Sequence, residues 1–252
     1  MVRSLLFTLI ASLMGTQVFA AHPLITDDTG TQGKGNTQIE FLAEYGRSRE
    51  AGAIEEDLTF PSIPTISYGL TEDTDLLFGA SYRYRRWNES GDEGTVRGIT
   101  DATIELKKRF FEKRGFSLAV KPGVTLPTGD ERKDLGVGRV TYRVFLIASK
   151  EHEPWAVHLN LGYVRNENSL NQRKDLWHTS VAGVITLTGK LKAVGNAGIE
   201  QDPDTDSSRL RFAVGGLILS LRDNLDLDMG VKVSTNGSTR GYAVPFGLTW
   251  RF

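Results

Sequence analysis

The chain ends on the stretch Tyr242-Ala-Val-Pro-Phe-Gly-Leu-Thr-Trp-Arg-Phe252, and this stretch decides the fold. Every second residue from Tyr242 to Phe252 is large and apolar, and the residues between them are mostly small or polar. Successive side chains of a β-strand point to opposite faces, so this alternation predicts a strand with one apolar face. No α-helix would place these six apolar side chains on one side.

The aromatic ending resembles the last strand of bacterial outer-membrane barrels, in which a final phenylalanine on the apolar face serves as an assembly signal. The resemblance implies that Trp250 and Phe252 form this signal here, and that the barrel-assembly machinery is a partner. A strand of a soluble sandwich would show the same alternation but would not account for the ending on Phe252.

Composition narrows the class of protein further. The 252 residues carry a formal net charge of −1 and include no cysteine. The small net charge argues against a nucleic-acid partner, and the lack of thiols excludes a disulfide framework or thiolate metal site. The mean hydropathy of −0.25 is too polar for a helical membrane protein but suits a barrel, which needs apolar residues only at alternate positions.

The first residues have the pattern of a cleaved export signal. Arg3 precedes the apolar run Leu5–Leu13, and Ala20 supplies a small residue for cleavage. The apolar run is shorter than the roughly 20 residues that a spanning helix needs, which disfavours an N-terminal anchor. We therefore predict a signal peptide over residues 1–20, an irregular polar segment over 21–35 and a transmembrane β-barrel over 36–252.

Alternating apolar residues predict about twelve strands in this last region. The predicted strands cover residues 38–45, 58–70, 76–85, 101–110, 116–126, 140–148, 155–163, 181–187, 191–199, 210–218, 225–233 and 242–252. Short turns alternate with longer polar loops, including loops expected over 46–57 and 86–98. Pro61 and Pro64 predict a bulge or a sheet edge. The pattern favours an all-β fold: a closed, antiparallel, up-and-down transmembrane barrel of the outer membrane, with lipid and lipopolysaccharide as further partners.

Several motifs carry a resemblance to a known family. Thr26-Asp-Asp-Thr-Gly30 at the start of the mature chain and Leu126-Pro-Thr-Gly-Asp130 after the fifth predicted strand resemble the outer-membrane family labelled "MetA-pathway of phenol degradation". Thr100 departs from the pattern, which would place glycine before Asp101. The resemblance implies a channel or transporter that passes aromatic or similar small molecules through the outer membrane.

Two motifs suggest other chemistry. His178 and Ser180, with Asn196 as a third member, resemble the site of an outer-membrane lipid hydrolase, but the predicted register turns both side chains into the lumen, so we expect no enzyme. Residues 202–208 resemble the start of a calcium loop, yet Ser207 and Ala213 stand where glycine and glutamate are needed. We predict a solvated acidic loop, and neither a metal site nor a cofactor.

Charged residues on the inward face suggest how a solute moves. Lys107, Arg109, Lys121 and Arg143 form a basic ladder along one wall, which we predict contacts a small anionic solute such as a carboxylate. The alternative is that these four residues pair with Glu40 and Glu44 across a narrow lumen, which would make a closed structural barrel. Other inward charges are expected to pair locally, Asp101 with Arg83 and Arg85, Glu200 with Arg209 and Arg211, and Asp226 with Arg251.

Overall fold

The computed structural model describes residues 22–50, 53–89, 92–205, 209–236 and 239–252. These ranges contain one short 3-10 helix, η1 (Glu131–Lys133), and thirteen β-strands. The strands are β1 (Thr37–Glu50), β2 (Ala53–Thr71), β3 (Thr74–Glu89), β4 (Asp92–Ile99), β5 (Ala102–Lys113), β6 (Phe116–Leu126), β7 (Thr141–His152), β8 (Trp155–Arg165), β9 (Asp175–Thr186), β10 (Leu191–Glu200), β11 (Leu210–Arg222), β12 (Leu225–Thr235) and β13 (Arg240–Arg251).

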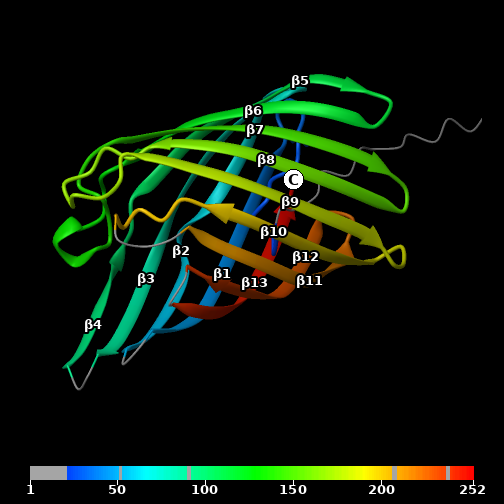
Figure 1. Ribbon diagram of the computed structural model, residues 1–252. Coiled ribbons are helices and arrows are strands. Elements are labelled where there is room, and N and C mark those ends of the chain that lie inside the picture. Colours follow the sequence, from blue (N-terminus) through cyan, green and yellow to red (C-terminus); the bar gives the residue numbers. More distant parts are fainter. Residues whose placement is uncertain (1–21, 51–52, 90–91, 206–208, 237–238) are drawn as a thin grey trace, which may run out of the picture.

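The strands form one antiparallel sheet that closes on itself (Figure 1). Strands that follow each other in the chain pair with each other except β4 and β5, which both pair with β3. The pairing of β13 with β1 and of β2 with β3 completes the circuit. β4 and β5 share one place in the wall, because β4 pairs with Tyr82–Glu89 of β3 and β5 with Thr74–Gly79. The wall is therefore twelve strands around, which confirms the predicted barrel.

The two ends of the barrel sequence close the wall. The Thr37 amide donates to the Phe252 carbonyl at 2.7 Å, and the Phe252 amide donates to the Thr37 carbonyl at 2.9 Å. Trp250 and Phe252 point outward, with exposed fractions of 47% and 59%, and their ring centroids lie 5.1 Å apart. The last residue thus completes the hydrogen-bond ladder and extends the outer apolar face.

The distribution of side chains is that of a membrane barrel. Large apolar residues are exposed on the outer face, among them Leu146, Leu161, Trp177, Met229, Val231 and Phe246. Small polar residues are buried on the inner face, among them Ser149, Asn160, Ser180 and Asn196. The outer face meets hydrocarbon, where a charge costs several kcal/mol at mid-depth, so the alternation fixes which face is which.

The predictions of loops over residues 46–57 and 86–98 are wrong. Residues 46–50 and 53–57 extend β1 and β2, and most of residues 86–98 belongs to β3 and β4. These strand ends project beyond the rest of the wall (Figure 1) and carry ion pairs such as Arg47–Glu56 at 3.8 Å and Arg86–Glu93 at 3.4 Å. A strand with water on both faces needs no apolar alternation, so hydropathy could not reveal it. The bulge expected at the prolines is present, as register shifts between Pro61 and Ile66.

Removing Phe252 tests the role of the closing residue. We expect less assembled barrel in the outer membrane, with an unchanged fold in the fraction that assembles, because the deletion removes two backbone hydrogen bonds and an outward ring. The measurement is the amount of folded protein on an unboiled detergent gel. Trp177→Leu, which alters an exposed aromatic far from the closure, is the control. Equal yields of the truncated and full-length chains would contradict an assembly role.

Candidate functional site

Residues 22–36, hereafter the luminal segment, lie inside the barrel. They contain no strand, so their backbone groups need other partners. Asn196 of β10 accepts from the amide of Ile25 at 2.7 Å, and Asn160 of β8 bonds both the amide and the carbonyl of Asp27, at 2.7 and 2.8 Å. Inward side chains of successive strands therefore hold this segment along the inner wall.

The segment lies in the half of the barrel that carries the short turns. Its first apolar residue, Leu24, packs with Ala156, Ala182, Val184, Val194 and Ile218. At its other end the amide of Gly35 donates to the carbonyl of Gly69 at 2.8 Å. Gly69 allows this approach, because a Cβ there would collide with the carbonyl of Gly33. By the general orientation of such barrels this is the periplasmic end.

Asp27 is the electrostatic centre of the segment. Its carboxylate binds the Lys121 ammonium at 2.7 Å and the Lys107 ammonium at 3.0 Å, and Asp28 lies 3.4 Å from Lys107. Burial by itself would raise the pKa of the Asp27 carboxyl, but the charges and hydrogen bonds of both lysines outweigh burial and hold that pKa below its usual range. The pairs therefore stabilise the fold above the ordinary pKa of an aspartate, and this contribution is lost as the pH falls through the lowered value.

The four residues of the predicted ladder separate into two groups. Lys107 and Lys121 meet at Asp27, and Arg143 is linked to them through Glu105, which lies 3.8 Å from both Arg143 and Lys121. Arg109 instead lies 3.3 Å from Glu112 near a turn. Glu44 pairs with Lys232 at 2.6 Å and with none of the four. Contact of these residues with a solute stays a prediction.

Other predicted pairs have mixed outcomes. Arg251 lies 2.8 Å from Asp226, as expected. Glu200, expected beside Arg209 and Arg211, instead lies 3.0 Å from His178 Nδ1. Arg83 pairs with Asp57 and Arg85 with Asp134, whereas Asp101 accepts hydrogen bonds from the amides of Gly129 and Val137, at 2.9 Å each. Asp101 thus ties the loop over residues 127–140 to the wall between β4 and β5, a role that pairing by charge alone does not predict.

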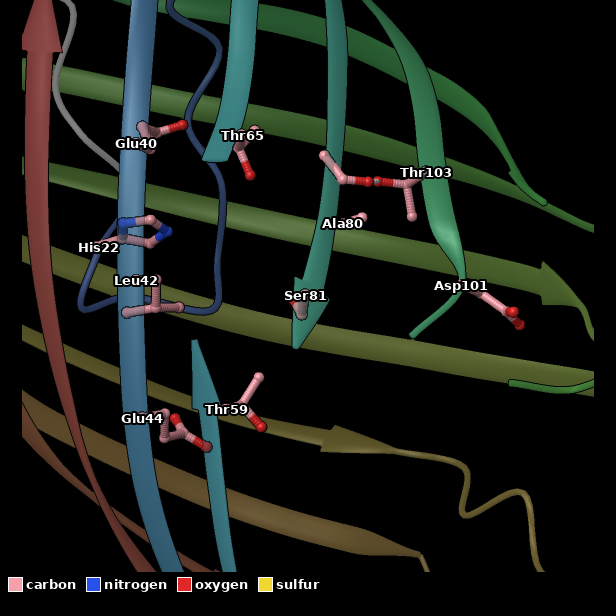
Figure 2. Close-up of a pocket in the computed structure, with 11 residues that line it drawn as sticks. His22, Glu40, Leu42, Glu44, Thr59, Thr65, Ala80, Ser81, Asp101 and Thr103 are labelled. Carbon is pink, nitrogen blue, oxygen red and sulfur yellow. Dashed lines mark hydrogen bonds between the residues drawn. The ribbon is translucent and has the colours of Figure 1, made fainter. Parts of the chain in front are cut away.

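Two cavities adjoin the luminal segment. One has a volume of about 290 Å³ and is bordered by His22, Glu40, Glu44, Thr59, Asp101 and Thr103, among others. Figure 2 shows Glu40 and Glu44 on the same strand with His22 beside them. The second, of about 220 Å³, is bordered by His22 and Glu40 again and by Asp27, Lys107 and Lys121. Carboxylates thus border both spaces, while the basic groups of the second already pair with acids.

His178 and Ser180 form a hydrogen-bonded pair. Ser180 Oγ lies 2.8 Å from His178 Nε2, and His178 Nδ1 lies 3.0 Å from Glu200, so the third member is Glu200 and not Asn196. Thr26 of the luminal segment donates its hydroxyl hydrogen to Ser180 at 2.7 Å. The pair therefore faces the lumen beneath the segment, on the side away from lipid.

A second serine–histidine pair makes equivalent contacts. Ser149 Oγ lies 2.8 Å from His158 Nδ1 and accepts from the amide of Thr29 at 3.1 Å. Because both pairs bind the same segment three residues apart, they serve as its anchors. A nucleophile would need an unobstructed hydroxyl beside its base.

The acidic loop at Asp202 is organised by an arginine. Arg173 donates to the carbonyls of Asp202, Asp204 and Thr205, at 2.8, 2.5 and 2.5 Å. Residues 206–208, where the calcium-like motif ends, lie outside the described residues. In the described part of the chain no group of three or more His, Asp or Glu side chains is arranged to hold a metal ion. The same ranges contain no helix with the length and hydropathy of a membrane span.

A closed barrel with an apolar outer band and a polar inner face defines an outer-membrane β-barrel protein. The chain belongs to the family described as "Putative MetA-pathway of phenol degradation", whose model matches residues 20–252. This confirms the resemblance seen in the sequence motifs. A comparison with curated proteins finds no match.

Solved structures show the same fold. An outer membrane channel from Pseudomonas putida F1 superposes with a TM-score of 0.68 at 14% identity, over 89% of this chain and 98% of that one. The β domain of the Bordetella autotransporter BrkA gives 0.57 at 12% identity, over 87% and 100%. The toluene transporter TbuX of Ralstonia pickettii gives 0.50 at 8% identity, over 87% and 89%. At these identities the likeness extends to the fold alone.

Asp27→Asn tests the anchor at the centre of the luminal segment. We expect the free energy of unfolding to fall by about 2 kcal/mol, which is less than the loss of a fully buried ion pair because Lys107 keeps Asp28 and Lys121 keeps Glu105. Urea unfolding in detergent measures it. Asp73→Asn, which removes a half-exposed partner of Lys108, should change stability little. Equal effects of the two substitutions would contradict an anchoring role for Asp27.

Ser180→Ala separates an anchor from a nucleophile. The variant should release fatty acid from phospholipid vesicles no differently from the unmodified barrel, while its stability toward urea falls as it does in Ser149→Ala. The shared reason is the loss of one hydrogen bond to the luminal segment. A hydrolytic rate above the vesicle background that Ser180→Ala abolishes and Ser149→Ala retains would show catalysis instead.

Proposed function

We propose that this protein is an outer-membrane channel for small aromatic solutes. The observation that carries the proposal is the pair of cavities inside the closed wall, next to a luminal segment that narrows the short-turn end. A barrel whose lumen is fully packed with side chains would serve only structure or surface contact, which was the alternative. The family description, which names phenol degradation, supports an aromatic solute. So do the names of a channel and a toluene transporter among proteins with this fold.

The lining favours a neutral solute over an anion. Glu40, Glu44 and Asp101 border the larger cavity, which no Lys or Arg side chain borders in the described part of the chain. Glu44 is paired with Lys232 and Asp101 already accepts two backbone amides, so Glu40 is the carboxylate best placed to accept a hydrogen bond from a hydroxyl and to repel another carboxylate. Lys107 and Lys121, two residues of the basic ladder that suggested an anion, pair with Asp27 and Asp28 instead. We therefore favour an uncharged aromatic molecule that carries a hydrogen-bond donor.

In this proposal the protein passes solutes and catalyses no reaction. Proteins of the same fold are channels, porins and autotransporter translocators, which is consistent with a non-enzyme. The burial of Ser180 beneath Thr26 and the duplicate pair at Ser149 support the same conclusion.

Permeation through the purified barrel tests this function. Liposomes that contain the protein should admit phenol faster than protein-free liposomes, and benzoate more slowly than phenol. In the fraction that assembles, deleting residues 24–34 should raise single-channel conductance several-fold, because the deletion removes the segment that narrows the lumen while sparing β1; Asp73→Asn should leave conductance unchanged. Liposomes with protein that admit neither solute faster than lipid alone would contradict the proposal.

A further inference from the structure

Arg49, Arg211 and Arg240, hereafter the rim arginines, lie in one row across the wall. The row crosses β11, β12, β13 and β1, which are successive strands (Figure 1). Arg211 lies opposite Thr235, Thr235 opposite Arg240, and Arg240 opposite Arg49. All four residues are close to the strand ends opposite the short turns. Residues that lie directly opposite one another share a face of the sheet, so the row has a single orientation.

The row faces away from the lumen. Along β13, Tyr242 and Phe246 follow Arg240 at even steps and are 46% and 49% exposed, whereas Ala243 is 3% exposed. Alternate residues of a strand share a face, so Arg240 lies on the outer one. The side chains of all three rim arginines are exposed. They therefore project from the outer surface of the barrel.

The rim arginines lie just beyond the outer aromatic residues. Tyr45 and Tyr242 are exposed on the outer face of β1 and β13. Arg240 is two residues further out than Tyr242, and Arg49 is four further out than Tyr45, where two residues of a strand span about 7 Å. Tyrosines of a barrel girdle lie where hydrocarbon meets the headgroups. The rim arginines therefore lie at the level of the lipid headgroups.

Two of the rim arginines place like charges next to each other. Arg49 lies directly opposite Arg240, and the Cβ atoms of such a pair are about 4.5–5.5 Å apart. Like charges in this arrangement destabilise a sheet. An anion that lies between the two guanidinium groups would remove the repulsion and receive hydrogen bonds from both.

Other outward arginines near this rim already have acidic partners. Arg47 lies 3.8 Å from Glu56, and Arg86 lies 3.4 Å from Glu93. Within the ranges that the structure describes, no carboxylate lies at ion-pair distance from a rim arginine. The rim arginines are therefore the part of this surface whose positive charge is left for an anion.

We propose that Arg49 and Arg240 together bind a phosphate group of lipopolysaccharide. The end of an outer-membrane barrel opposite its short turns lies in the outer leaflet, where lipid A carries phosphates on its sugar headgroup. Arginine binds phosphate through two parallel hydrogen bonds, and basic clusters at headgroup level recognise anionic lipids. Arg211 lies two strand spacings from Arg240, roughly 10 Å, and contacts a second phosphate of the same headgroup. The acyl chains of this lipid lie along the apolar outer face.

Titration with lipid A tests the proposal. The mature barrel is refolded in detergent from inclusion bodies, free of lipopolysaccharide, and bound lipid is counted by native mass spectrometry. We expect the double variant Arg49→Gln with Arg240→Gln to bind diphosphoryl lipid A at least several-fold more weakly than the unmodified protein. Dephosphorylated lipid A should bind both proteins equally weakly. Arg86→Gln, which removes an arginine already paired with Glu93, should bind like the unmodified protein.

Stability toward urea gives a second readout, whose sign depends on the lipid. Without lipid A the double variant should be at least as stable as the unmodified protein, because the like charges are gone. Diphosphoryl lipid A should stabilise the unmodified protein and leave the double variant unchanged. Equal binding of diphosphoryl lipid A by the two proteins would overturn the proposal. Equal stabilisation by inorganic phosphate or by phosphatidylglycerol would overturn it too, since the arginines would then accept any anion.

Discussion

The closed hydrogen-bond ladder is the constraint on which the rest of the structure depends. Hydrocarbon offers no partner for a backbone amide or carbonyl, so a wall of strands in the bilayer must have no free edge. Here the bonds between Thr37 and Phe252 and the pairing of β2 with β3 remove both edges. Closure then divides every strand into lipid-facing and lumen-facing residues, and the apolar alternation of the sequence follows from it.

The same closure creates a polar interior that has to be satisfied in turn. Asn160, Asn196 and Ser149 are almost fully buried, and each would be costly without a partner. The luminal segment supplies backbone donors and acceptors to these side chains, and they supply the partners that its irregular backbone lacks. Wall and segment thus complete each other, which makes the segment an integral part of the fold.

The sequence predicts the wall well and the interior poorly, for physical reasons. Alternation is a local signal, so the spanning parts of the strands, the faces and the Asp226–Arg251 pair could be predicted. The segment that contains Asp27 has no periodicity, and its ion-pair partners lie 80 and 94 positions away at Lys107 and Lys121. Nothing local distinguishes those lysines from ones that face an empty lumen. The acidic pair Asp27-Asp28 was the available signal, because buried lysines need an opposite charge nearby.

The assignment of those charges changes what the lumen selects. Counted alone, Lys107 and Lys121 make one wall basic and attract an anion. Paired with Asp27 and Asp28, they contribute almost no net field, and the larger cavity is bordered by Glu40, Glu44 and Asp101, of which Glu44 is itself paired with Lys232. Fields inside low-dielectric walls are strong, so neutralising these two lysines removes much of the attraction that a basic wall would have for an anion. In the proposed channel, selectivity would therefore depend on which charged side chains of the wall pair with the luminal segment.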